Sequence, residues 1–141
     1  MFNVLFIKAT ILCIILLLAS IQDIKSHEVS DFYHVLIVAT ALIGISLPQL
    51  PGMLIGAFFI TLPVLIVEIR HPGGIGGADI KLTAACTFFL GIQRGLVFLL
   101  IGLILAVVSN RIINAVMKTR YKEPFALVPY LSVGCMVAYL V

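Results

Sequence analysis

Six apolar stretches follow one another along the chain, separated by short polar, glycine-containing or proline-containing segments. They fall at about 4–22, 33–48, 52–69, 79–92, 95–116 and 125–141. A helix needs roughly 20 residues to cross a hydrocarbon core ~30 Å thick. The first, third and fifth stretches meet that length, and the second and sixth come close to it. The pattern predicts an all-α, polytopic membrane protein with about six transmembrane helices, forming a single domain over residues 1–141.

The fourth stretch is shorter than the others. Its 14 residues, 79–92, would cover only about 21 Å as a helix. Either the bilayer thins there, or the glycine-rich turn before it dips into the membrane and carries Asp79 down. Irregular backbone at membrane depth is tolerated only where protein buries it or where it lines a wet cavity. We favour the dipping turn, which predicts a water-accessible pocket around Asp79. The alternative is one longer helix that runs through Gly91 and Arg94 and changes the span count.

Prolines and glycines within the apolar stretches predict bends and close packing. Pro63 and Pro129 lie inside predicted spans, where a proline removes a backbone donor and kinks a helix. Gly52 and Gly56 form a GxxxG pattern, for which we expect a packing role.

Composition agrees with a membrane protein. Hydrophobic residues make up 62% of the chain and charged residues 11%, whereas soluble domains contain about 25% charged residues. The net charge of +3 is small, and no basic run alternates with aromatic residues. These features do not support nucleic-acid binding, and we interpret the basic residues as topology signals.

Six spans would place both termini on one side of the membrane, and charge indicates which side. Only Lys8 and Arg94 fall on the side of the termini, whereas seven basic residues fall on the other: Lys25, Arg70, Lys81, Arg111, Lys118, Arg120 and Lys122. The positive-inside rule makes the second side cytoplasmic. Asp23 and Asp79 share that side. We therefore expect a multi-pass protein of the cell membrane with its site at the cytoplasmic face.

The cysteines and histidines do not form a metal-binding pattern. Cys13, Cys86 and Cys135 are far apart in apolar sequence, without a CxxC pair, and we expect them to act as small hydrophobes. The three histidines, His27, His34 and His71, are also scattered. We therefore expect no metal and no cofactor.

Two aspartates at the ends of apolar spans indicate proteolytic chemistry. Asp79 directly follows a run that contains four glycines, and Asp23 ends the first span. An ionisable residue at or below the membrane surface is costly and therefore suggests a functional site. Two adjacent carboxylates can share a proton and activate a water molecule for attack on a peptide bond. Sequence alone does not assign the acid and base roles within such a pair. No GxSxG, HExxH or P-loop spacing supports a competing chemistry.

The segment from Gly73 to Leu82, GGIGGADIKL, resembles the GxGD signature of type IV prepilin peptidases, which usually reads close to GGxGGGDxKL. Around Asp23, the acid and the basic residue after it are similar to the first motif of that family. The segment PFALVPYL at 124–131 resembles its last span. The resemblance covers about residue 10 to the end of the chain.

The resemblance implies an aspartic endopeptidase with Asp23 and Asp79 as catalytic residues and Gly76, Gly77, Ala78 and Lys81 as supporting residues. Ala78 stands where the family usually has glycine. If that position needs a positive φ, its methyl group costs roughly 1 kcal/mol or more. For Lys81 we expect a position near the lipid headgroups, or alternatively a charge that keeps one carboxylate ionised. Glu28 and Asp31 are expected to be solvated loop charges rather than partners of Asp79.

The resemblance also implies a peptidase-only form without the cysteine-containing methyltransferase region of larger family members. The expected substrate is a prepilin-like protein with a short basic leader and a hydrophobic helix, cut at the cytoplasmic face. Expected partners are this substrate, the lipid bilayer and the pilus-assembly machinery. Two other functions stay open at this point. One is a small ion or proton conduit, and the other is an inactive assembly subunit, for which Ala78 is the best support.

Overall fold

The computed structural model describes residues 2–73, 75–117 and 126–141. The elements in chain order are α1 (Phe2–Ser26), α2 (Asp31–Leu42), the 3-10 turn η1 (Leu47–Gln49), α3 (Leu50–Arg70), α4 (Gly77–Met117) and α5 (Val128–Leu140). Every element among the described residues is helical, which confirms the all-α fold class.

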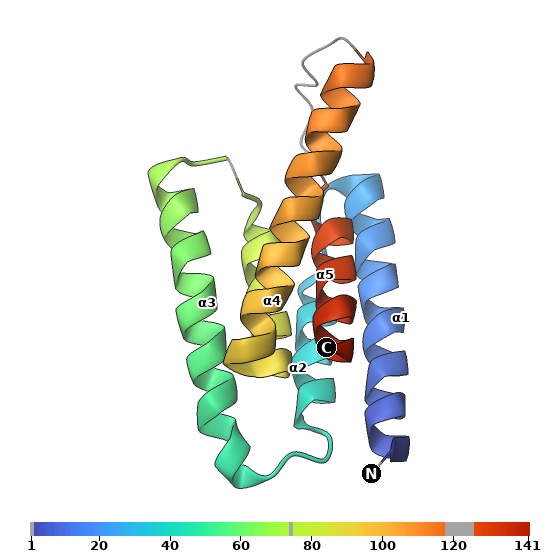
Figure 1. Ribbon diagram of the computed structural model, residues 1–141, viewed down its shortest axis with the longest axis vertical. Helices are drawn as coiled ribbons and strands as arrows, with labels where there is room; N and C mark the ends of the chain where they lie inside the picture. Colours follow the sequence, from blue (N-terminus) through green and yellow to red (C-terminus); the bar gives the residue numbers. More distant parts are fainter. Residues whose placement is uncertain (1, 74, 118–125) are drawn as a thin grey trace.

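The long helix α4 is divided by a break at Gly91. This residue has φ 74° and ψ −176°, a conformation that only glycine adopts without strain. Residues 77–90 descend in Figure 1 and residues 92–117 return upward. The alternative of a single helix through Gly91 is therefore wrong. The separate, short fourth segment predicted from the sequence is present.

Three helical segments are long and apolar enough to cross a membrane: Val4–Ser26, Leu47–Arg70 and Gly77–Val116. The predicted count of six spans is not confirmed. The physical reason is length, because α2 and α5 have 12 and 13 residues and rise only about 18–20 Å. The first part of α4 is similarly short, at about 21 Å.

The core lies among α1, α2, α4 and α5. Its largest fully buried side chains include Phe98, Leu12, Leu16, Ile37, Leu82 and Leu131. Cys86 and Cys135 are buried in the same cluster, and Cys13 is partly buried. Helix α3 packs mainly on α4. Large apolar side chains, such as Phe58 and Phe59, are exposed on its outer face, as expected for a lipid-facing surface.

Glycines allow the closest helix contacts. A Cβ at Gly56 would lie 2.7 Å from the backbone nitrogen of Ile92, beside the break in α4. A Cβ at Gly134 would lie 2.7 Å from the carbonyl oxygen of Phe98. Gly56 thus has the predicted packing role, whereas a Cβ at Gly52 would meet nothing within 4 Å. Pro129 is in the first turn of α5, where the missing donor costs nothing, so the expected bend within a span at this residue is wrong.

The helices alternate in direction, so chain ends from different helices meet. In Figure 1, α1 and α3 end toward the upper part of the view, and α2, α4 and α5 begin there. We call this the aspartate end of the bundle, because it contains Asp23 and Asp79. Lys8 and Arg94 line a separate cavity toward the opposite end, beside η1 and the break at Gly91.

Candidate active site

A cavity of about 530 Å³ opens at the aspartate end. Asp23 from α1 and Asp79 from α4 both line it, together with residues of the 27–30 loop, the start of α2 and the glycine-rich turn. The two side chains are buried, with 6% and 8% of their surface exposed. The fold thus brings together two carboxylates that are 56 positions apart in the chain.

Asp79 is held by the start of its own helix. It is the third residue of α4, and its Oδ2 accepts a hydrogen bond of 3.1 Å from the backbone N–H of Gly76. An acid that reaches back in this way satisfies one of the free donors of a helix N-terminus. The positive end of the helix dipole also favours the ionised carboxylate there.

Asp23 is held by a different helix. Its Oδ2 accepts a 3.2 Å hydrogen bond from the backbone N–H of Val128, the first residue of α5. The two carboxylates therefore contact the N-termini of α5 and α4. The positive ends of both helices offset part of the repulsion between two like charges in a buried site.

A buried hydroxyl pair continues the contact between α1 and α5 near Asp23. The Oγ atoms of Ser20 and Ser132 lie 2.9 Å apart, and each also contacts a carbonyl oxygen of its own helix. This pair helps to fix the two helices that position Asp23.

The second oxygen of Asp79 is buried and has no hydrogen-bond partner among the residues that the structure describes. Buried polar atoms are nearly always paired, so such an atom calls for a functional reason. In this cavity, Oδ1 is available to bind a water molecule, a substrate group or a shared proton.

Glu68 shapes the glycine-rich turn. Its two carboxylate oxygens accept hydrogen bonds from the backbone N–H groups of Gly73, at 2.8 Å, and Ile75, at 2.7 Å. Gly73 has φ 87°, where a side chain would be strained. Sequence reasoning assigned no role in the site to Glu68. The available signal was an acid in the last turn of a span, just before a turn with many unpaired donors.

The three residues before Asp79 differ in how much space a Cβ atom has. A Cβ at Gly76 would lie 3.0 Å from Oδ2 of Asp79, so this glycine permits the close approach of the carboxylate. A Cβ at Gly77 would meet nothing within 4 Å. Ala78 is the second residue of α4 and has no positive φ, so the strain considered for its methyl group is absent. That methyl group instead packs against the core cluster.

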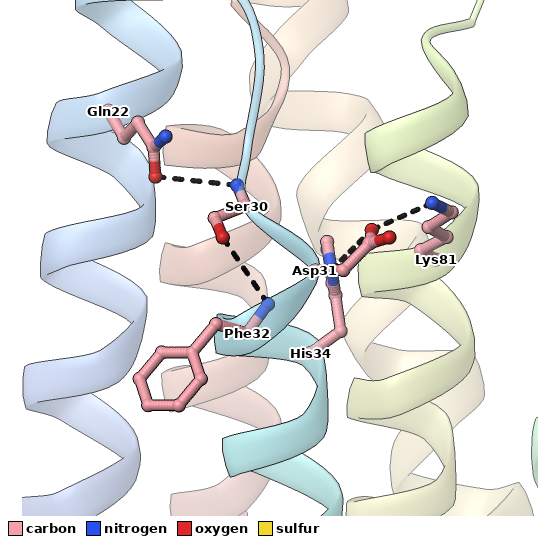
Figure 2. A network of polar contacts seen from close by, with 6 residues as sticks. All are labelled: Gln22, Ser30, Asp31, Phe32, His34 and Lys81. Atoms are coloured by element: carbon pink, nitrogen blue, oxygen red, sulfur yellow. Dashed lines mark hydrogen bonds and ion pairs between the residues drawn. The ribbon is translucent and has the colours of Figure 1, made fainter.

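Asp31 and Lys81 form an ion pair that connects α2 with α4, with 2.7 Å between Oδ1 and Nζ (Figure 2). The hydrogen bond and the charge of Lys81 hold the pKa of Asp31 below its ordinary value. Asp31 is exposed, as expected for a loop charge, but it is paired rather than only solvated. Gln22 of α1 accepts from the N–H of Ser30 in the same network (Figure 2). Glu28 also lines the cavity.

Within the described ranges, no three His, Cys, Asp or Glu side chains converge in a group that could hold a metal ion. The chemistry that this site offers is that of two buried carboxylates at helix N-termini.

Comparison with known protein families identifies the family of this chain. A model of the type IV leader peptidase family matches residues 10–109. The chain belongs to this family. The matched region contains Asp23, the glycine-rich turn and Asp79, and it ends before α5. Comparison with curated proteins and with solved structures gave no match. Family membership indicates a peptidase that acts on prepilin-like substrates, and together with the apolar helices it indicates a membrane protein.

Proposed function

We propose that this leader peptidase is an aspartic endopeptidase that removes the leader of a prepilin-like protein at the cytoplasmic face of the cell membrane. Asp23 and Asp79 are the proposed catalytic residues. The observation that carries the proposal is that these two buried carboxylates line one cavity in a chain of the type IV leader peptidase family.

The proposed reaction uses a water molecule between the two carboxylates. One carboxylate is ionised and accepts a proton from this water while the water oxygen attacks the scissile carbonyl carbon. The other carboxyl group is protonated and donates a hydrogen bond to the carbonyl oxygen. As the tetrahedral intermediate collapses, a proton passes to the leaving nitrogen and the C–N bond breaks. Oδ1 of Asp79 has no hydrogen-bond partner among the described residues, which supports a role in holding the water or the shared proton.

The turn and the helix ends are proposed to keep this pair in place. Gly76 and Val128 each donate a backbone N–H to one of the carboxylates, which leaves the other oxygen of each for chemistry. Glu68 is proposed as a positioning residue, because it binds the turn that leads into Asp79.

Charge distribution gives no support to an ion conduit. Such a path calls for acids at several depths, whereas Asp23, Glu28, Asp31 and Asp79 all line one cavity at one end of the bundle. The inactive-subunit alternative also loses its main argument, since Ala78 is an unstrained helical residue.

Co-expression with a candidate prepilin tests the proposal, with leader removal followed on a gel. We expect Asp23→Asn and Asp79→Asn each to abolish cleavage while the protein still accumulates in the membrane. Asp31→Asn is the matched control. It should retain processing, because an ion pair between exposed side chains contributes little to stability. Full processing by either of the first two variants would rule out the paired-acid mechanism.

A further inference from the structure

A second cavity, of about 300 Å³, lies directly beside Asp79. It is enclosed by α3, both parts of α4 and the start of α5, and Asp79 is its one charged lining residue among the described residues. Thr83 is its other polar lining residue, and the hydroxyl of Thr83 already donates to the carbonyl oxygen of Asp79 at 2.8 Å. Apart from the carboxylate, this cavity therefore offers an incoming group only apolar contacts.

The apolar cavity adjoins the aspartate cavity. Ile75, Asp79 and Leu127 line both of them, so a chain bound across the carboxylates reaches from one cavity into the other. The two cavities differ in polarity, because the first is lined by four acids and Lys81, whereas Asp79 is the one charged residue that lines the second among the described residues. A substrate that crosses this boundary would present a polar or basic part to the first and an apolar part to the second.

We propose that the apolar cavity is the subsite for the apolar side chain that follows the scissile bond. This inference rests on the proposed function, since it takes Asp79 as a catalytic residue. Polarity sets the direction of the chain. The basic, polar leader lies in the aspartate cavity, in which Asp31 is already paired with Lys81, and the first residue of the hydrophobic segment enters the apolar cavity.

The cavity walls also indicate how such a segment reaches the site. Val64, Thr83 and Leu131 form a buried floor, whereas Val67 and Leu103 are partly exposed at the rim. Val67 is on α3 and Leu103 is on the second part of α4, so the cavity opens between these helices toward the apolar outer surface. A substrate helix that stays in the bilayer therefore has access from the side.

The test uses variants that change the volume of the cavity. Val64→Phe fills it from the floor, and Leu103→Ala widens its rim. Val107→Phe, at an exposed position of α4 that lines neither cavity, is the matched control. Each protein is assayed as the full chain with two forms of one prepilin-like substrate, which carry either Phe or Ala directly after the scissile bond. The measured quantity is the ratio of the two cleavage rates, which does not depend on the amount of folded enzyme.

We expect Val64→Phe to lower the Phe-to-Ala ratio by about tenfold or more, as misfit in an apolar pocket usually does. Leu103→Ala should raise the Phe-to-Ala ratio. Val107→Phe should give the ratio of the parent protein. If the parent cleaves both substrates but neither cavity variant changes the ratio, the subsite inference is wrong. If Val64→Phe fails to fold, an unchanged ratio in Leu103→Ala alone overturns the inference. If the parent cleaves neither substrate, the proposed function fails instead.

Discussion

At the scale of single residues, the chemistry depends on what remains unpaired. Each aspartate has one oxygen bound to a backbone N–H at a helix N-terminus. The other oxygen of Asp79 is buried without a partner among the described residues, although such an atom costs about 1–3 kcal/mol. The surrounding turn holds the carboxylate in this position despite the cost. Such a buried polar atom is typical of a group that binds a ligand or a water molecule during function.

Two adjacent glycines give a sharp test of this arrangement. Gly76→Ala should displace the Asp79 carboxylate, because the new methyl group would lie 3.0 Å from Oδ2. We expect leader cleavage to fall by about tenfold or more, in line with the effect of small misplacements in an active site. Gly77→Ala is the control and should retain near-parental cleavage, since its methyl group meets open space. Equal loss in both variants would contradict a specific role for Gly76.

Glu68 provides a second residue-scale prediction. Glu68→Ala removes the acceptor of two backbone N–H groups of the turn. A hydrogen bond to a charged group contributes at most about 1.5–3 kcal/mol to the stability of the fold. We expect lower thermal stability in detergent and slower leader cleavage. Arg70→Gln, two residues on, should change stability by about 1 kcal/mol or less. Unchanged cleavage in Glu68→Ala would show that the turn holds Asp79 without this carboxylate.

At the scale of helices, the site depends on backbones that approach closely. Helix α5 supplies the N–H that binds Asp23, and its position against α4 is set where Gly134 meets Phe98 and Gly102. The break at Gly91 then reverses α4, so that its second part packs against α5 while its first part places Asp79 in the cavity. Small residues at these crossings let apolar helices pack without a side chain between them.

Gly134→Ala should therefore destabilise the bundle. Its methyl group would lie 2.7 Å from a backbone oxygen of α4, which cannot move aside as a flexible side chain can. Overpacking of this kind costs typically 1–3 kcal/mol. We expect a lower thermal unfolding temperature in detergent and weaker cleavage. Gly52→Ala, where the added atom has open space, should unfold at the parental temperature or slightly above it. A parental unfolding temperature for Gly134→Ala would contradict the close packing of α4 on α5.

At the scale of the whole molecule, the alternating helices separate two chemically different ends. The aspartate cavity is lined by four acids and Lys81, whereas the cavity toward the opposite end contains Lys8 and Arg94 and no acid among its described lining residues. From the positive-inside rule we expect the aspartate end to face the cytoplasm. In this proposed topology, the short segment 77–90 would connect the two sides, although it rises only about 21 Å.

Cysteine labelling in sealed membrane vesicles tests this topology. His71 is exposed in the turn before α4, and Gln93 is exposed just after the break at Gly91. We expect His71→Cys to react with a membrane-impermeant maleimide only from the cytoplasmic side, and Gln93→Cys only from the outer side. The parent protein, with Cys86 and Cys135 buried, serves as the background control. Labelling of both variants from the same side would mean that segment 77–90 does not cross the membrane.

Much of this organisation could be predicted from local sequence. Apolar stretches reveal helices because burial in lipid or core requires continuous apolar surface. A break was expected between the stretches 79–92 and 95–116, and the structure has it at Gly91. The helix boundaries were less predictable. Pro129 lies in the first turn of α5 and does not bend the helix, because a proline is tolerated in the first turn, where its missing N–H is not needed.

The amino-acid sequence alone was sufficient for the helical class, the two candidate aspartates and the family resemblance, because each depends on residue type and spacing within a short segment. Contacts between distant segments required the folded chain. These are the Val128 N–H on Asp23, the Asp31–Lys81 ion pair and the apolar cavity beside Asp79. The physical reason is that hydrogen bonds and cavities depend on positions within a few ångströms, and only the packing of the helices sets such positions.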